Sequence, residues 1–350
     1  MKKLLITTVF IFLICARGFC ENLYPINDKS GGGYINKFGV IVLKQDYNFA
    51  YRFNGSYAIV KAKNLKYGVI DKKGNVVVDF IYDDLIDLSQ DVVTYKKDGK
   101  YGYIDILKNK KFEPSYNGIK KFQEGLLGVK VNDKWGFIDR YGKIKIEPKY
   151  YDIGNFSEGL APVAYSEDKT AGYINKKGKL VISFKDNTLR LREFSEGLAP
   201  YIQGEDRACS YINKRGKTVI DSKKIYPMSA YCGNFYNGYT VFYIDNNPRE
   251  IITGYMDKNA KIKYSMTFSI PKDVSEGEFS AFDYFSSDMA QFTLDYRTGY
   301  IDSKFNLVIP PIYEFARDFI DDLAYVKFED KEGYINKSGQ WVWSKEREGM

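Results

Sequence analysis

The chain has 350 residues, of which 31 are Tyr, 24 are Phe and 3 are Trp, and it contains no His. The lack of His excludes Ser-His-Asp and Cys-His catalysis and removes the commonest zinc ligand. The net charge is +7, and it falls to +4 if Lys2, Lys3 and Arg17 are removed with a leader. This charge is too mild, and the basic residues too scattered along the sequence, for a nucleic-acid partner to be expected.

Residues 1–20 have the layout of a secretory signal peptide. Two lysines precede an apolar stretch from Leu4 to Ala16, and small residues that suit a signal peptidase follow. Cleavage after Gly18 or after Cys20 fits, and the lipidation of Cys20 stays open. No later segment approaches the roughly 20 apolar residues of a membrane helix. We therefore expect an exported mature chain, residues 21–350, that is periplasmic, on the cell surface or secreted, without a transmembrane segment.

Two motifs recur in fixed phase along the mature chain. The first has its cores near residues 33, 68, 102, 136, 172, 210, 254, 299 and 333, as in GYINKFG, GFIDRYG and GYINKSG. The second is FQEGLLGV at 122, FSEGLAPV at 156 and FSEGLAPY at 194, with weaker copies elsewhere. A period of this length predicts a tandem array of about nine supersecondary units, so residues 21–350 are expected to form a single repeat domain.

One unit is expected to form a β-hairpin or a three-stranded meander, which makes the chain all-β. Strands are predicted at 160–165, 172–175 and 179–184, and the alternation of Lys143, Ile144, Lys145 and Ile146 indicates a half-buried strand. Between the last two strands, Asp139 to Gly142 has the residue preferences of a type I turn followed by a left-handed glycine. Copies without this Gly have Asn109, Asn259 or Asn306 nearby, and we expect the Asn to be left-handed there.

Such units can close into a β-propeller or stack as an open superhelix. Propellers usually close by sharing one blade between the two chain ends, yet GYINKFG and GYINKSG place the same part of the unit at both ends. The first copy also has no upstream strand of the FSEGLA type. These observations favour an open superhelical stack with atypical end units, with a closed β-propeller as the alternative.

The combined motif KWGFIDRYGKIKIEPKYYDIGNFSEGLAPV at 134–163, together with its eight relatives, resembles the WG-repeat (KWG repeat) family of bacterial proteins. This resemblance covers nearly the whole mature chain. It implies a β-rich repeat array that serves as a binding or interaction module without an assigned catalytic activity. The eponymous Trp-Gly pair occurs only at Trp135-Gly136, which argues against a function that needs the same aromatic residue in every repeat.

Three aromatic residues and two cysteines are the candidate site residues. Tyr67, Tyr101 and Trp135 occupy equivalent positions in successive repeats. Their rings either pack between units or form an exposed ladder that contacts a ligand by stacking on sugars or on partner aromatics. In an oxidising compartment Cys209 and Cys232 either form a disulfide or are two buried small residues.

No sequence pattern points to an enzyme. The glycine-rich stretch at 31–39 lacks the strand-to-helix context and the Gly-Lys-Ser/Thr ending of a phosphate loop, and the recurring carboxylates are explained by turns. We expect no metal and no cofactor. The leading hypothesis is a non-enzymatic exported protein that acts as a protein-binding scaffold in the cell envelope or outside the cell. The alternative is a carbohydrate or cell-wall-binding module, with a wall glycan as its partner.

Overall fold

The computed structural model describes residues 22–165, 171–184, 190–203, 208–221, 233–247, 250–269 and 282–347. These residues form strands, turns and connecting segments, and none of them belongs to a helix that is long and apolar enough to cross a membrane. The predicted signal peptide, including Cys20, lies outside the described residues. The chain divides into two compact units, Met1–Ser115 and Tyr116–Met350.

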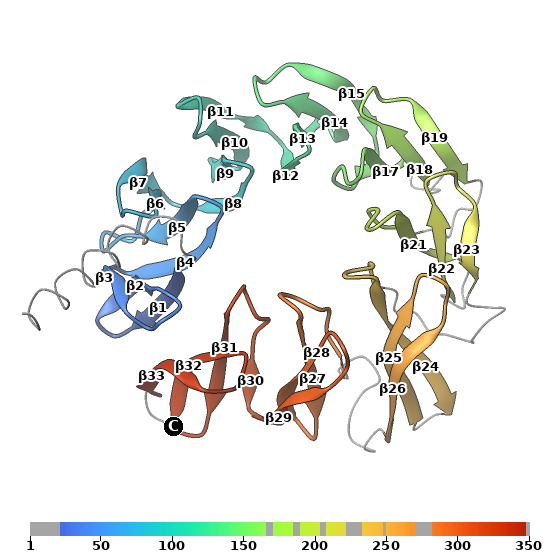
Figure 1. The fold of residues 1–350 in the computed structure, drawn as a ribbon. Helices are drawn as coiled ribbons and strands as arrows, with labels where there is room; N and C mark the ends of the chain where they lie inside the picture. The colour runs from blue at the N-terminus through green and yellow to red at the C-terminus, as the bar shows by residue number, and fades with distance from the viewer. Residues whose placement is uncertain are drawn as a thin grey trace, which may run out of the picture. The chain divides into compact units, whose positions relative to one another are not determined.

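The first unit contains three antiparallel sheets (Figure 1). The first sheet has three strands, β1 (Tyr24–Asp28), β2 (Gly31–Ile35) and β3 (Ile41–Tyr47). The second consists of β4 (Phe49–Asn54), β5 (Tyr57–Lys61), β6 (Tyr67–Asp71) and β7 (Val76–Tyr82). The third consists of β8 (Leu85–Ser89), β9 (Val92–Lys97), β10 (Lys100–Asp105) and β11 (Lys110–Tyr116).

The second unit contains six sheets. The first three sheets have four strands each. One consists of β12 (Gly118–Gln123), β13 (Leu126–Val131), β14 (Lys134–Asp139) and β15 (Ile144–Tyr150), and the next of β16 (Asp152–Ile153), β17 (Leu160–Ala164), β18 (Ala171–Asn175) and β19 (Leu180–Phe184). The third consists of β20 (Arg190–Leu191), β21 (Leu198–Gln203), β22 (Ala208–Asn213) and β23 (Thr218–Asp221). Two sheets with three strands each follow. One consists of β24 (Tyr239–Asn247), β25 (Glu250–Asp257) and β26 (Ile262–Ser269), and the other of β27 (Met289–Leu294), β28 (Arg297–Asp302) and β29 (Leu307–Tyr313). The last sheet has β30 (Phe315–Ala316), β31 (Leu323–Phe328), β32 (Lys331–Asn336) and β33 (Trp341–Glu346).

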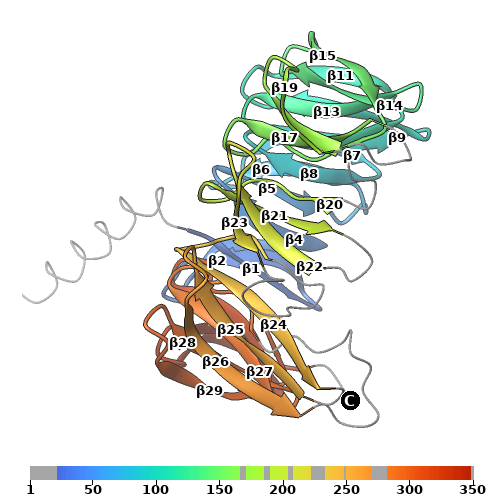
Figure 2. The same ribbon diagram turned by 90° about the vertical axis from the view of Figure 1, so that its right-hand side faces the viewer.

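These sheets are the blades of a β-propeller, and the expectation of an open superhelical stack was wrong. Within each sheet the described strands pair in chain order, so every repeat builds its own antiparallel meander (Figure 2). The prediction from the chain ends failed because β1 pairs with β2 and supplies the strand that the first repeat was thought to lack. The expected three-stranded unit is also too small for six of the nine sheets, which have four strands.

The aromatic residue of the first motif holds neighbouring blades together. It is fully or almost fully buried in every blade where it is Tyr or Phe, as for Tyr173 and Tyr300. The Tyr173 hydroxyl donates to the carbonyl oxygen of Arg192 at 2.7 Å, and the Tyr300 hydroxyl donates to that of Arg317 at 2.7 Å. Both acceptors belong to the segment that begins the next blade. Burial raises the pKa of both hydroxyls well above the ordinary value, so they stay protonated donors.

The predicted turn chemistry is confirmed between the third and fourth strands. One carboxylate oxygen of Asp139 accepts from the backbone N–H groups of Tyr141 at 2.9 Å and Lys143 at 3.0 Å, and Gly142 has a φ of 81°. In the copies without Gly, Asn109 is left-handed as expected. In the other two copies Ala260 and Phe305 are left-handed rather than the neighbouring asparagines, because the hydrogen bonds of the turn fix the position and not the residue type.

Candidate functional site

The three predicted aromatic contact residues are all half-buried, and each has a lysine over its ring. The Lys61 Nζ lies 5.2 Å from the centroid of Tyr67, and the Lys96 Nζ lies 5.3 Å from that of Tyr101. The Lys120 Nζ lies 4.9 Å from the centroid of Trp135. An ammonium over an aromatic face is an attractive contact in its own right. One face of each ring is therefore occupied by the protein itself.

The rings also take part in local packing. Trp135 packs beside the buried cluster that contains Tyr150 and Ile153, and the Tyr67 ring lies 6.3 Å from that of Tyr51. Tyr67 and Tyr101 belong to the first compact unit, whereas Trp135 belongs to the second. Trp135 thus contacts residues of its own blade and of the next one, and the prediction that the three aromatic residues contact a ligand stays a prediction.

The same strand position carries other side chains in other blades. Glu332 occupies it in the last blade and forms ion pairs with Lys327 at 3.1 Å and Lys345 at 3.0 Å. Thr298 occupies it in β28, with its hydroxyl 3.3 Å from that of Thr293. These residues lie opposite one another on paired strands. The position is therefore filled by whatever suits the cross-strand neighbour, which explains why no single aromatic residue recurs there.

Cys209 lies in β22, the third strand of the blade β20–β23, and it is buried and disulfide-bonded. Its predicted partner, Cys232, lies outside the described residues, so the pairing itself stays a prediction. A disulfide here is typical of a protein that folds in an oxidising compartment.

A cavity of about 430 Å³ opens where the blades β12–β15, β16–β19 and β20–β23 meet. Its apolar lining includes Ile153, Pro162, Val163 and Ala171, which are buried. Its charged lining comes from Lys120, Asp152, Arg190, Arg192 and Glu193. Sequence reasoning missed this site because its lining is drawn from three repeats.

The charged groups of the cavity are unequally paired. Lys120 Nζ lies 3.6 Å from a carboxylate oxygen of Asp152, and the Glu193 carboxylate accepts from the backbone N–H of Asn155 at 3.1 Å. Arg190 and Arg192 are exposed, and neither forms an ion pair with a described residue. Two guanidinium groups are therefore open to an anionic ligand at the edge of an apolar depression.

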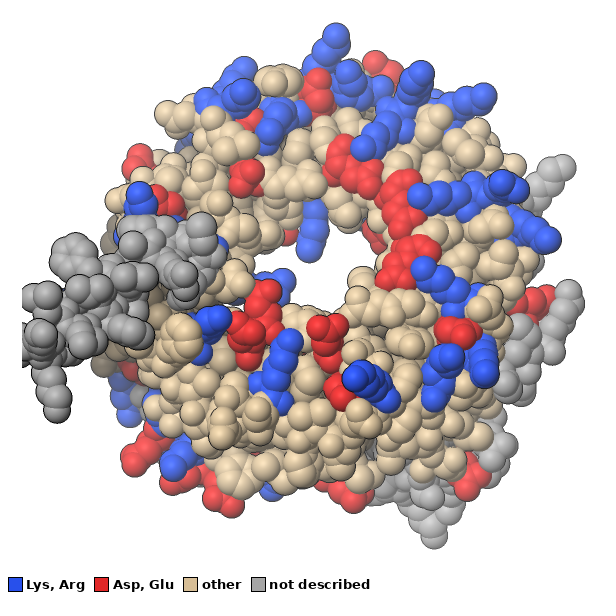
Figure 3. Space-filling model, in the orientation of Figure 1, with Lys and Arg blue, Asp and Glu red and all other residues tan. Residues whose placement is uncertain are grey.

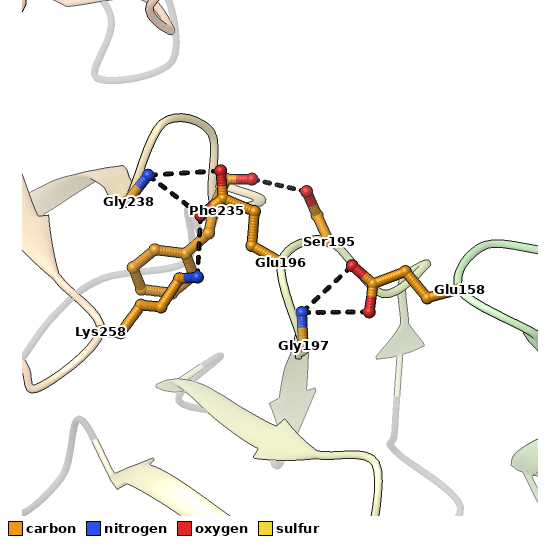
Figure 4. Close-up of polar contacts among 7 residues, drawn as sticks. All are labelled: Glu158, Ser195, Glu196, Gly197, Phe235, Gly238 and Lys258. Carbon is orange, nitrogen blue, oxygen red and sulfur yellow. Dashed lines mark hydrogen bonds and ion pairs between the residues drawn. The ribbon is translucent and has the colours of Figure 1, made fainter.

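The second motif forms contacts between blades, a role that the sequence did not reveal. We call Glu124, Glu158 and Glu196 the bridging glutamates. The Glu158 carboxylate accepts from the Gly197 N–H of the next blade at 3.0 Å (Figure 4). It also pairs with Lys214 of that blade at 2.9 Å. Glu196 repeats the arrangement with Gly238 and Lys258, and Glu124 repeats it with Gly159 and Lys176.

Neighbouring serines add a second contact at two of these turns. The Ser157 hydroxyl donates to the carbonyl oxygen of Phe194 at 2.7 Å, and Ser195 donates to that of Phe235 at 2.5 Å. Partial burial alone would raise the pKa of Glu158, but hydrogen bonds from Lys214 and the Gly197 N–H outweigh burial and hold the pKa below the ordinary value. Glu158 is therefore a structural anion rather than a free acid group.

Within the described ranges there is no group of three or more Cys, Asp or Glu side chains able to hold a metal ion. The cavity has carboxylates, but Asp152 is paired with Lys120 and Glu193 is hydrogen-bonded to Asn155. What this site offers chemically is recognition of a ligand by shape and charge.

Comparison with solved structures shows the fold. The crystal structure of the eukaryotic initiation factor is similar with a TM-score of 0.64 at 9% identity, over 93% of this chain and 96% of that one. Apo AztD from Citrobacter koseri gives a TM-score of 0.45 at 13% identity, over 94% of this chain and 95% of that one. No curated protein matches the sequence.

The repeat itself is matched at the level of a family. The WG containing repeat matches residues 33–65, 67–101, 101–135, 135–165, 172–205 and 299–331. These segments cover more than half of the chain and include Tyr67, Tyr101 and Trp135. The chain therefore belongs to the family of proteins with the WG containing repeat.

Proposed function

We propose that this protein is a non-enzymatic scaffold that binds a protein partner in the cell envelope or outside the cell. The cavity beside Arg190 and Arg192 carries the proposal. Its volume of about 430 Å³ lies in the range of ligand pockets, roughly 300 to 1,000 Å³. The disulfide at Cys209 supports action in an oxidising compartment.

The lining indicates which peptide the cavity would take. Buried Val163 and Ala171 suit an apolar side chain, whereas the two arginines suit a carboxylate. A partner segment with an apolar residue next to Asp, Glu or a chain terminus satisfies both parts. We therefore propose that the partner docks through a short apolar and acidic segment.

A wall glycan is the second candidate, and one observation favours it. Tyr151 lines the cavity and is 44% exposed, so its ring is available to stack on a sugar. The cavity offers this ring in place of the predicted ladder of Tyr67, Tyr101 and Trp135, each of which has a face covered by lysine.

Panning a random displayed-peptide library on residues 21–350 tests the proposal. We expect enriched peptides with an apolar residue beside an acidic one, and loss of their binding in Arg190→Glu combined with Arg192→Glu. A matched control is Lys97→Glu combined with Lys100→Glu, which makes the same change in charge at two exposed residues of the first unit. Peptides that bind the parent and both variants equally would refute the cavity as the site.

Co-sedimentation with purified wall sacculi tests the second candidate. If the parent chain sediments with the sacculi, Tyr151→Ala does not, and the panning enriches no peptide, the partner is a glycan and not a protein.

A further inference from the structure

Six exposed cations lie in the same part of three consecutive blades of the second unit. We call them the cation row: Lys143, Lys145, Lys177, Lys179, Arg215 and Lys217. Lys177 and Arg215 lie in the turn between the third and fourth strands of their blades, and the other four cations lie just after that turn. The sequence hides this row, because the pairs are separated by a whole repeat and look scattered.

The turn geometry sets the row in register. The side-chain oxygen of Asn175 accepts from the backbone N–H groups of Lys177 at 3.0 Å and Lys179 at 3.1 Å. Asn213 does the same for Arg215 at 3.0 Å and Lys217 at 3.1 Å. One anchor residue therefore holds the backbone of both cations in these two blades, so these two pairs recur with the same local geometry. In the preceding blade Asp139 holds Lys143 at the position of Lys179 and Lys217, and Tyr141 takes the position of Lys177 and Arg215.

The bridging glutamates of these blades are already occupied. The bridging glutamates accept glycine N–H groups and pair with Lys176, Lys214 and Lys258, the first residues of the same kind of turn. No member of the cation row forms an ion pair among the described residues. Figure 3 shows acidic side chains toward the first strands of these blades and basic ones toward the fourth strands β15, β19 and β23.

Positive charge is concentrated in this part of the second unit. Residues 116–220 contain 19 Lys and Arg against 13 Asp and Glu, whereas residues 221–350 contain 15 against 20. The mild net charge of the whole chain therefore conceals a basic segment and an acidic one. A concentrated, unpaired positive surface attracts polyanions at long range.

We propose that the cation row binds a linear polyanion, a polymer that carries a phosphate diester or a carboxylate in each repeating unit. A group of similar charges that recurs from blade to blade suits repeating anions better than the irregular charges of a folded protein. Lys177 and Arg215 occupy the turn tips, where a membrane-binding surface would carry an apolar residue to insert. The exposed Leu180 and Val181 follow the cations along β19 and suit contact with an aliphatic polymer backbone.

This surface is separate from the cavity, so it goes beyond the proposed docking of a protein segment. None of the six cations lines the cavity. A protein with both surfaces could be held on an anionic polymer of the envelope while its cavity engages a partner.

Binding of polyphosphate and of polygalacturonate to residues 21–350, measured by fluorescence anisotropy at several salt concentrations, tests the proposal. The two probes distinguish a phosphate polymer from a carboxylate polymer. We expect at least one probe to bind, with an affinity that falls steeply as the salt concentration rises. The variant with Lys177, Lys179, Arg215 and Lys217 all changed to Gln should bind about tenfold more weakly or worse, with a shallower salt dependence.

The matched control changes Lys44, Lys63, Lys97 and Lys100 to Gln, which removes the same charge from exposed positions of the first unit. The control should keep at least half of the parent affinity, and circular dichroism should show that both variants are folded. Equal weakening in the two variants would mean that total charge alone is responsible, and it would overturn the proposal. So would tighter binding to anionic lipid vesicles than to both probes.

Discussion

The blades of residues 116–221 and those of residues 233–347 hold their neighbours by different chemistry. In the first group the bridging glutamates connect successive blades by charged hydrogen bonds. In the second group the same motif position is occupied by Asn237, Ser287 and Asp321. There an aromatic cluster packs between two blades instead, and it contains Tyr239, Tyr255, Tyr264, Phe282, Phe285, Phe292 and Phe305.

One propeller geometry is thus maintained by two kinds of contact. Charged contacts near the surface leave the first group with cations, carboxylates and a cavity, whereas aromatic packing in the second group closes the space between blades. Ser286 still donates to the carbonyl oxygen of Phe319 at 2.7 Å, as Ser157 and Ser195 do in the first group. The serine contact is shared by both groups, and the chemistry around it has diverged.

The largest expected effect is on the aromatic cluster. The Phe285 ring lies 4.8 Å from that of Tyr255 and 5.9 Å from that of Phe305. Phe285→Ala should lower the free energy of unfolding by about 3 to 5 kcal/mol, since it leaves a cavity among buried rings. Urea unfolding followed by tryptophan and tyrosine fluorescence measures this loss. Tyr296→Ala, at a residue that is 73% exposed, is the control and should change stability by no more than about 0.5 kcal/mol.

A bridging glutamate should matter less. Glu158→Ala removes the partner of Lys214 and of the Gly197 N–H and should cost about 1 to 2 kcal/mol. Ser287→Ala, at the equivalent position of the second group, removes only the acceptor for the Asp321 N–H and should cost about 1 kcal/mol or less. If the two substitutions cost the same in urea unfolding, the distinction between charged and aromatic contacts would lose its energetic basis.

The bridging glutamate Glu158 should also contribute to the pH dependence of stability. The folded pKa of Glu158 lies below its ordinary value of 4.5, so the unfolded chain takes up the proton first as the pH falls. The stabilisation is therefore present at neutral pH and is lost as the pH falls through and below 4.5. Glu158→Gln should flatten the decline of the unfolding midpoint between pH 6 and about pH 3. A decline identical to that of the parent chain would show that this glutamate contributes nothing.

The smallest expected effect concerns the lysines over the predicted contact aromatics. Lys96→Met keeps most of the side-chain bulk beside Tyr101 but removes the ammonium, and it should cost about 0.5 to 1 kcal/mol in urea unfolding. A gain in stability would show that the Lys96 ammonium does not stabilise the fold through its contact with Tyr101.

The repeat, the strand character and the turn chemistry could be predicted from the sequence because each depends on a few neighbouring residues. The Asp139 turn is an example, since its hydrogen bonds span four residues. The first strands of several blades could not be predicted. Strands such as Asp152–Ile153 and Arg190–Leu191 have two residues, and two residues show no alternation.

Contacts between repeats were also beyond the reach of the sequence. Glu158 read as part of a turn, yet its carboxylate binds groups 39 and 56 positions further on, at Gly197 and Lys214. The cavity and the cation row arise in the same way, from residues that only the propeller brings side by side. For the same reason the prediction of an open stack, which rested on the chain ends, gave the wrong architecture.

The central claim is that the blades of residues 116–221 carry two separate binding surfaces. The direct test measures the affinity of an enriched acidic peptide and that of polyphosphate or polygalacturonate under the same conditions. Three proteins are compared: the parent chain, the variant with Arg190→Glu and Arg192→Glu, and the cation-row variant. We predict that the first variant loses the peptide and keeps at least half of its polyanion affinity, and that the second does the reverse. Loss of both ligands in either variant, or of neither ligand in both, would contradict the account.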